Sequence, residues 1–134
     1  MNNEEFRRNP ESADCPRVVV GVLISNDKGD ILLTTARKWE GQWTCQGGHL
    51  EYGEALEDAA KRESKEETNL DVTDIRLVCV QDAIFPGDYH RKSHMVFIDY
   101  SCRAANPGKL RLNHELQDFK WLNPEKALEM NLND

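Results

Sequence analysis

The first apolar segments of the chain are separated by a polar turn. Residues 17–25 (RVVVGVLIS) are rich in β-branched side chains and almost continuously apolar, as in a buried strand. Residues 26–30 (NDKGD) favour a turn, and the apolar pattern resumes over residues 31–35. The pattern therefore predicts a β-hairpin, followed by a loop and a short strand that ends at Gly47 and Gly48.

The strongest helical pattern covers residues 54–69. Leu56, Ala59 and Ala60 form an apolar stripe at helical spacing, and two oppositely charged pairs lie four residues apart on the polar side. Asn69 follows where a helix often closes with a left-handed residue, a conformation that Asn tolerates better than most residues. We expect one amphipathic helix here.

Further strands and a short helix are predicted in the second half of the chain. Residues 74–85 and 93–104 have the composition of two longer strands on either side of a turn. Residues 106–108 (NPG) form another turn signal, and residues 117–122 fit a last strand. Pro124 then opens a short helix in its favoured first turn. This order predicts an α+β fold, an α/β/α sandwich around a mixed sheet.

Length and composition fit one soluble domain. The chain has 134 residues, of which 39% are hydrophobic and 31% charged. We interpret residues 1–16 as a polar N-terminal arm without a signal-peptide pattern, and residues 17–134 as one domain. No apolar run approaches the roughly 20 residues that span a bilayer, so we expect no membrane partner.

Charge and cysteine content narrow the classes of partner. A net charge of −7 argues against a nucleic-acid-binding surface. An anionic substrate would therefore need metal ions or a local basic patch to attract it. The four cysteines are scattered without a C-x-x-C pair, which favours a reduced, cytoplasmic protein. Cys79 and Cys102 lie in apolar runs, and we expect both in the core.

Three glutamates on the predicted helix are the main candidates for chemistry. Glu63, Glu66 and Glu67 fall within an arc of roughly 100° on one helix face. Hard cations such as Mg²⁺ prefer oxygen ligands, and a metal on this face could activate a water for attack on phosphorus. The alternative is a solvated acidic face, which is the commoner meaning of such a cluster in a chain with 24 acidic residues.

The spacing of the residues around this helix favours a metal site over a solvated acidic face. The segment fits the pattern G-x₅-E-x₇-R-E-x-x-E-E, for which chance predicts a match in a chain this short on the order of once in 10⁵. The fixed positions are Gly48, Glu54, Arg62, Glu63, Glu66 and Glu67. The segment resembles the Nudix box, the signature of the Nudix hydrolase family, and the resemblance extends over roughly residues 17–131.

The resemblance implies a loop–helix–loop that binds a divalent metal ion, Mg²⁺ or alternatively Mn²⁺. Glu63, Glu66 and Glu67 match the metal ligands of the family, and Glu66 or Glu67 is expected to orient or deprotonate the water. Gly47 or Gly48 would present a backbone carbonyl to the metal.

The resemblance also implies supporting residues, and the chain departs from the usual pattern in places. Arg62 and Glu54 match the pair that holds the loop–helix–loop together. Ser64 replaces a small apolar residue, and we expect its hydroxyl either to bond the carbonyl of Ala60 or to lie at a packing edge. Gln46 replaces a proline before the two glycines, which predicts a less rigid loop.

Candidates outside the box complete the predicted site. Glu115 lies in a stretch that resembles the nucleoside triphosphatase branch of the family, where an acidic residue joins the site; a surface carboxylate is the alternative. The candidate substrate-binding residues are Arg37, Trp39, His49, Phe85 and Tyr89. For each of these, solvent exposure or packing is the competing interpretation.

The resemblance predicts an enzyme that hydrolyses phosphoanhydride bonds of a small-molecule nucleotide. A nucleoside triphosphate pyrophosphohydrolase is the leading hypothesis. A nucleotide sugar, ADP-ribose or a dinucleotide is the alternative substrate, and a non-catalytic nucleotide-binding module is a third hypothesis. The sequence leaves open whether the chain forms a homodimer.

Overall fold

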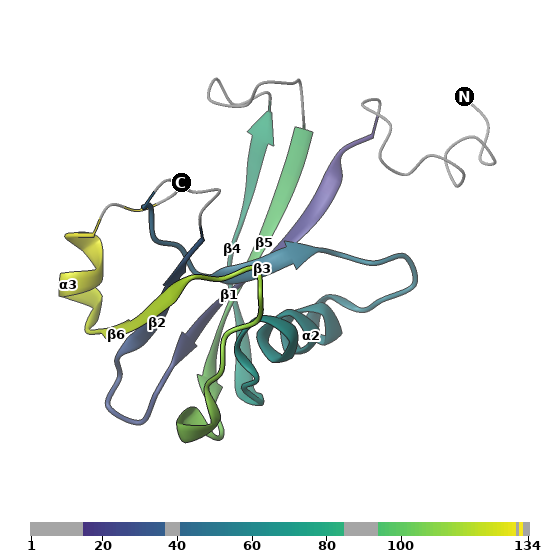
Figure 1. Cartoon of the computed structure of the whole chain (residues 1–134). Coiled ribbons are helices and arrows are strands. Elements are labelled where there is room, and N and C mark those ends of the chain that lie inside the picture. The colour runs from purple at the N-terminus through teal and green to yellow at the C-terminus, as the bar shows by residue number, and fades with distance from the viewer. Residues whose placement is uncertain (1–14, 37–40, 85–93, 131, 133–134) are drawn as a thin grey trace.

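A mixed six-stranded sheet forms the centre of the protein (Figure 1). The computed structural model describes residues 15–36, 41–84, 94–130 and 132. The sheet order is β4–β5–β1–β2–β6, with β3 paired to β1. The strands are β1 (Arg17–Ser25), β2 (Ile31–Thr35), β3 (Gln46–His49), β4 (Val72–Ile84), β5 (His94–Ala104) and β6 (Asp118–Leu122).

Strand β1 is central because it pairs on both sides. It runs parallel to β5 and antiparallel to β3 and β2. Val20, Val22 and Ile24 alternate along β1 and are fully buried, as expected for one face of a strand covered by a helix. Gly47 faces Gly21 across the β1–β3 pair, and a Cβ at Gly47 would collide with the carbonyl oxygen of Val20. Only glycine fits at position 47.

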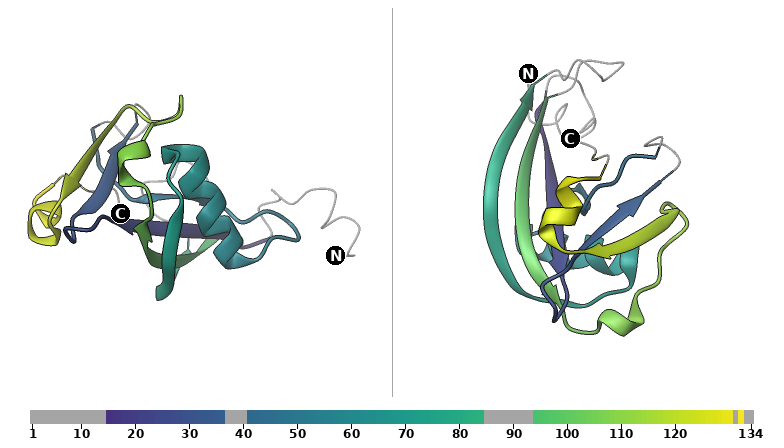
Figure 2. Two further views of the ribbon diagram at one scale, coloured as in Figure 1. Left: turned by 90° about the horizontal axis from the view of Figure 1, so that it is seen from below. Right: turned by 90° about the vertical axis from the view of Figure 1, so that its left-hand side faces the viewer.

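Helix α2 (Leu56–Thr68) packs against β1 and β3 (Figure 2). Ala59 and Ala60 have no exposed surface, and their small side chains let the helix lie close to the sheet. The hydroxyl of Ser64 donates to the Ala60 carbonyl at 2.8 Å, as predicted, so this polar residue is buried without an unpaired donor. The core thus accepts a serine where the family pattern has an apolar residue.

The C-terminal part closes the β2 side of the sheet. The 3₁₀ helix η2 (Pro107–Lys109) follows β5, and β6 then pairs antiparallel with β2. Helix α3 (Pro124–Leu128) begins after Asn123, whose side chain accepts a hydrogen bond from the Lys126 N–H at 2.8 Å. This helix contacts β2 and β6, on the side of the molecule away from α2 (Figure 2).

The sequence predictions of the elements are confirmed with shifted ends, and one core prediction is wrong. Helix α2 begins at Leu56 rather than residue 54 because Ala55 is still extended, with φ −75° and ψ 150°. Cys102 is buried, but Cys79 is exposed on β4, since the edge strand carries no covering element there among the described residues. No helix in the described part of the chain is long and apolar enough to cross a lipid bilayer.

The end of α2 gives a testable prediction. Asn69 adopts the left-handed conformation, with φ 63°, and its N–H bonds the Lys65 carbonyl at 3.0 Å. Asn69→Val should lower the free energy of unfolding by about 1–2 kcal/mol, because a β-branched residue is strained there. Asn69→Gly should change it by less than about 0.5 kcal/mol, since glycine adopts this conformation freely but loses the Asn side-chain bond to Lys109. Urea unfolding measures both, and equal losses would contradict this role of position 69.

Candidate active site

Helix α2 and strand β3 bring two glutamates against the glycine pair. Glu63 and Glu67 are both buried, although each carries a carboxylate. The Glu63 carboxylate lies against Gly48, where any Cβ would collide with its oxygens. The Gly47 N–H donates to Glu67 Oε2 at 3.3 Å. The missing side chain at position 48 therefore makes room for the Glu63 carboxylate, and the backbone N–H of Gly47 binds the second carboxylate.

Arg62 connects the helix to the loop before it. Its Nε and Nη2 donate to the two carboxylate oxygens of Glu54 at 2.7 and 3.0 Å, a bidentate pair. Nη2 also donates to the carbonyl oxygen of His49 at 3.1 Å, at the end of β3. One guanidinium thus joins α2, the loop and β3.

The same guanidinium lies beside the acidic face of the helix. Arg62 Nη1 is 2.9 Å from Glu63 Oε1 and 3.2 Å from Glu66 Oε2. Glu51 completes this set at 3.7 Å and also bonds Glu54 through its backbone N–H. One positive charge therefore stands among four carboxylates within ion-pair distance.

Hydrogen bonds and burial shift the pKa values of three groups in this cluster. The hydrogen bond from Arg62 lowers the pKa of Glu54. The pKa of Arg62 itself is raised, first by its bond to Glu54. Burial raises the pKa of Glu63 despite its bond to Arg62, and the charges of Glu66 and Glu115 add to this rise. The site stabilises the charge of Glu54 but leaves Glu63 with uncompensated negative neighbours.

Glu66 and Glu115 lie at the exposed side of the cluster. The Glu66 side chain is 56% exposed and reaches back to Arg62. Glu115 is exposed as well, on a segment that the Asn113 N–H ties to the Glu67 carbonyl at 3.1 Å. The influence of Glu115 on the pKa of Glu63 places the two carboxylates within electrostatic reach, far apart as they are in sequence.

The residues of the cluster fit a hard divalent cation. Carboxylate oxygens and backbone carbonyl oxygens are ligands that Mg²⁺ prefers. The pKa of Glu63 is raised first by burial, and the charges of Glu66 and Glu115 add to this rise. Among the described residues, no group of three or more His, Cys, Asp or Glu already has the arrangement that holds a metal ion. Arg62 holds Glu63 and Glu66, so binding a cation would require these side chains to exchange partners.

The predicted site residues divide into those brought together and those not described. Glu54, Arg62 and the three helix glutamates lie together beside Gly47 and Gly48. The His49 side chain is exposed, and its backbone carbonyl, which the sequence did not single out, binds Arg62. Four candidate substrate-binding residues lie outside the described residues: Arg37, Trp39, Phe85 and Tyr89.

Gln46, the departure from the family pattern expected to loosen the loop, is bonded through its side chain to the neighbouring strand. It is the first residue of β3, is 1% exposed and donates from Nε2 to the Thr34 hydroxyl at 3.0 Å. The amide thus connects the start of the glycine strand to β2, while its Oε1 is buried without a hydrogen-bond partner among the described residues.

A helix rich in carboxylates, held by one arginine against a glycine strand, offers oxygen ligands of the kind that a hard cation prefers. Comparison with known proteins agrees. The model of the NUDIX domain matches residues 16–134, so the chain belongs to the Nudix hydrolase family of pyrophosphohydrolases.

Relatives in sequence and structure support this assignment. The nucleoside triphosphatase NudI of Escherichia coli O17:K52:H18 is 32% identical over 126 residues, which cover 87% of this chain and 89% of that protein. The crystal structure of a MutT NUDIX hydrolase from Burkholderia pseudomallei is 28% identical, has a TM-score of 0.71 and covers 90% of this chain and 89% of its own. The NUDIX domain of NrtR from Shewanella oneidensis, solved with ADP-ribose, shares the fold at 20% identity, with a TM-score of 0.73 and coverage of 98% and 90%.

The Arg62–Glu54 pair predicts a pH-dependent stability. Because the folded-state pKa of Glu54 is lowered, its charge stabilises the fold above the ordinary glutamate pKa of about 4.3, and this contribution disappears as the pH falls through the lowered value. The melting temperature of Glu54→Gln should therefore lie below that of the unmodified chain at neutral pH, and the difference should narrow in acid. Calorimetry from pH 7 to pH 3 measures it. Glu57→Gln, on the exposed side of the same helix, is the control; a gap at Glu54 that stays constant with pH would contradict the ion pair.

The excess of carboxylates predicts stabilisation by Mg²⁺. A cation that binds only the folded chain must raise its melting temperature, and a few degrees are expected at millimolar MgCl₂. Glu67→Gln removes one buried carboxylate and should reduce this shift by at least half, although relief of repulsion can raise its melting temperature without metal. Glu57→Gln should keep the full shift. Equal shifts in all three proteins would show that the cation binds elsewhere.

Proposed function

We propose that this chain is a Mg²⁺-dependent nucleoside triphosphate pyrophosphohydrolase, which releases a nucleoside monophosphate and pyrophosphate. The observation that carries this proposal is the intact box cluster, in which Glu63 and Glu67 are buried at Gly48 and Gly47. The relative at 32% identity is a nucleoside triphosphatase, and that activity fits a chain with Glu115 beside the same cluster.

The reaction is a displacement at phosphorus by water. The water oxygen forms a bond to phosphorus, the bond from phosphorus to the bridging oxygen breaks, and the leaving phosphate group takes the electron pair. A bound Mg²⁺ would neutralise the phosphate oxygens and lower the pKa of a coordinated water. Glu63 and Glu67 would hold the ion, together with a carbonyl of the glycine pair.

Other residues of the cluster would position the water and support the site. Glu66, the most exposed of the three helix glutamates, is placed to orient the water and take its proton together with Glu67. Arg62 keeps the helix, the loop and β3 in one arrangement through Glu54 and the His49 carbonyl. The acidic chain repels a bare triphosphate, so substrate and cation would bind together.

Other nucleoside diphosphate derivatives remain the alternative substrate class. The NrtR domain binds ADP-ribose on the same fold, but at 20% identity that likeness carries the fold alone. The products separate the classes, because a triphosphate yields pyrophosphate whereas a nucleotide sugar or ADP-ribose yields a sugar phosphate. A module without catalysis is disfavoured, since every acidic position of the box is retained.

Purified protein with Mg²⁺ should release pyrophosphate from at least one member of a panel of ribo- and deoxyribonucleoside triphosphates. Glu67→Gln and Glu66→Gln should each lower kcat by about 10²–10⁴-fold, because a positioned proton acceptor contributes on that order. A coupled pyrophosphate assay with chromatography of the nucleotide measures both products.

The matched control is Glu57→Gln, which removes the same charge from an exposed position of α2 outside the Arg62 cluster. It should retain full activity. Turnover in H₂¹⁸O identifies the phosphorus attacked, since the label enters either the monophosphate or the pyrophosphate. Equal rates for unmodified chain and Glu67→Gln, or nucleotide binding without products across the panel, would refute the proposal.

A further inference from the structure

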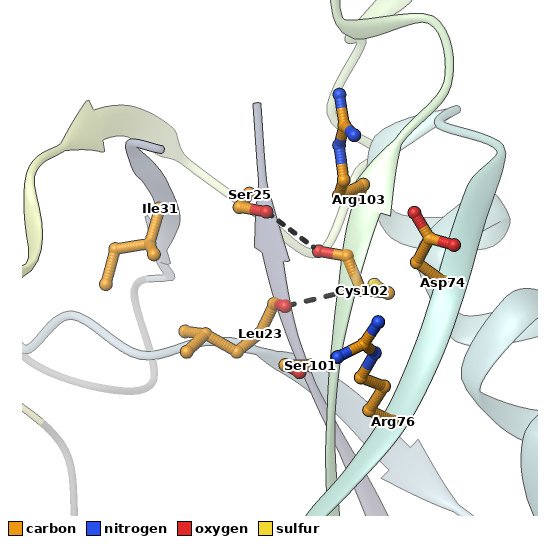
Figure 3. Close-up of a pocket in the computed structure, with 8 residues that line it drawn as sticks. All are labelled: Leu23, Ser25, Ile31, Asp74, Arg76, Ser101, Cys102 and Arg103. Atoms are coloured by element: carbon orange, nitrogen blue, oxygen red, sulfur yellow. Dashed lines mark hydrogen bonds between the residues drawn. The ribbon is translucent and has the colours of Figure 1, made fainter. Parts of the chain in front are cut away.

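A concave site lies at the C-terminal end of β1, and none of the Nudix cluster residues lines it (Figure 3). It is a cavity of about 490 Å³ between the ends of β1 and β5 and the starts of β2 and β4. Leu23 and Ile31 form its apolar side. Its polar side carries Asp74, Arg76, Ser101 and Arg103. This volume is within the range of small-molecule sites, roughly 300–1,000 Å³.

Arg76 is the cation without a partner at this cavity. Within the described residues its guanidinium makes no hydrogen bond and no ion pair, in a chain with 24 acidic residues. Arg103, by contrast, is held by Asp27 at 2.8 Å. Figure 3 shows the Arg76 guanidinium turned from β4 toward Ser101 on β5, its partner in the strand register.

The Arg76 side chain projects from an irregular stretch of β4. The β4–β5 register shifts between Thr73 and Arg76 and again between Leu77 and Cys79, so Arg76 lies between two irregularities. Asp74 has φ 52°, a left-handed conformation that Asp tolerates better than most residues. Bulges often re-aim a side chain next to a binding site.

We propose that this cavity is a binding site for a small phosphate monoester, distinct from the Nudix site. The phosphate would be held by the guanidinium of Arg76 and the hydroxyl of Ser101, with Arg103 adding positive charge. A guanidinium presents paired donors that match phosphate oxygens. The organic part of the ligand would pack on Leu23 and Ile31. Because the site offers cationic donors of its own, binding needs no metal ion.

Phenyl phosphate tests this proposal because it joins a phosphate to a small apolar body. Titration into ¹⁵N-labelled protein in EDTA should give saturable shifts of the Arg76, Ser101 and Arg103 amide signals. EDTA removes divalent cations, so the carboxylate cluster at Gly47 and Gly48 repels the probe. Arg76→Gln should raise the Kd at least tenfold, and phenol, which lacks the anion, should give no saturable shift.

Arg111→Gln is the matched control, since it removes the same charge from an exposed position that does not line the cavity. It should bind phenyl phosphate as the unmodified chain does. Arg103→Gln provides a second cavity variant with a smaller expected loss, because Asp27 already neutralises Arg103. Absence of saturable shifts at these amides, or equal weakening by Arg76→Gln and Arg111→Gln, overturns the proposal. Neither result depends on pyrophosphate release, so this experiment tests the cavity independently of the proposed enzymatic function.

Discussion

The arrangement of the site depends on one guanidinium among several carboxylates. Arg62 bonds both oxygens of Glu54 and the carbonyl of His49, and it restrains Glu63 and Glu66 at the same time. Without this cation, the acidic side chains of the helix and the loop would repel one another across the glycine strand. Among the described residues, Arg62 is the one cation within ion-pair distance of Glu51, Glu54, Glu63 and Glu66. The same residues therefore form an ordered structure and offer the ligands of the proposed cation site.

Local features of the fold follow from the sequence because they depend on neighbouring residues. The spacing of Ala59 and Ala60 predicts the buried helix face, and Asn69 closes the helix in the left-handed conformation expected of it. The contact between Arg62 and Glu54 is expected from the resemblance to the Nudix box, because Glu54 lies before the helix and helical spacing alone does not predict it. Family resemblance supplies the roles assigned to these residues, and the geometry brings the side chains together without testing those roles.

Features that depend on distant strands could not be predicted in this way. Cys79 lies in an apolar run, but β4 is the edge strand, so the pattern that signals burial fails there. Gln46 replaces a proline, and only the partner strand shows that its amide bonds Thr34. The register of Arg76 with Ser101 depends on two irregularities in β4, which no periodicity of the chain indicates.

The proposed Nudix site and the proposed site at the end of β1 would bind an anion to an acidic protein in opposite ways. At the glycine strand, Glu63 and its acidic neighbours repel phosphate, so a phosphate can approach only with a cation that neutralises both. At the end of β1, Arg76 provides the positive charge from the chain itself and has no competing carboxylate within ion-pair distance among the described residues. Burial raises the cost of an unbalanced charge, and Glu63 is buried whereas Arg76 is exposed. The metal requirement should therefore belong to the first site alone, so the same phosphate group would depend on Mg²⁺ at the glycine strand and not at the end of β1.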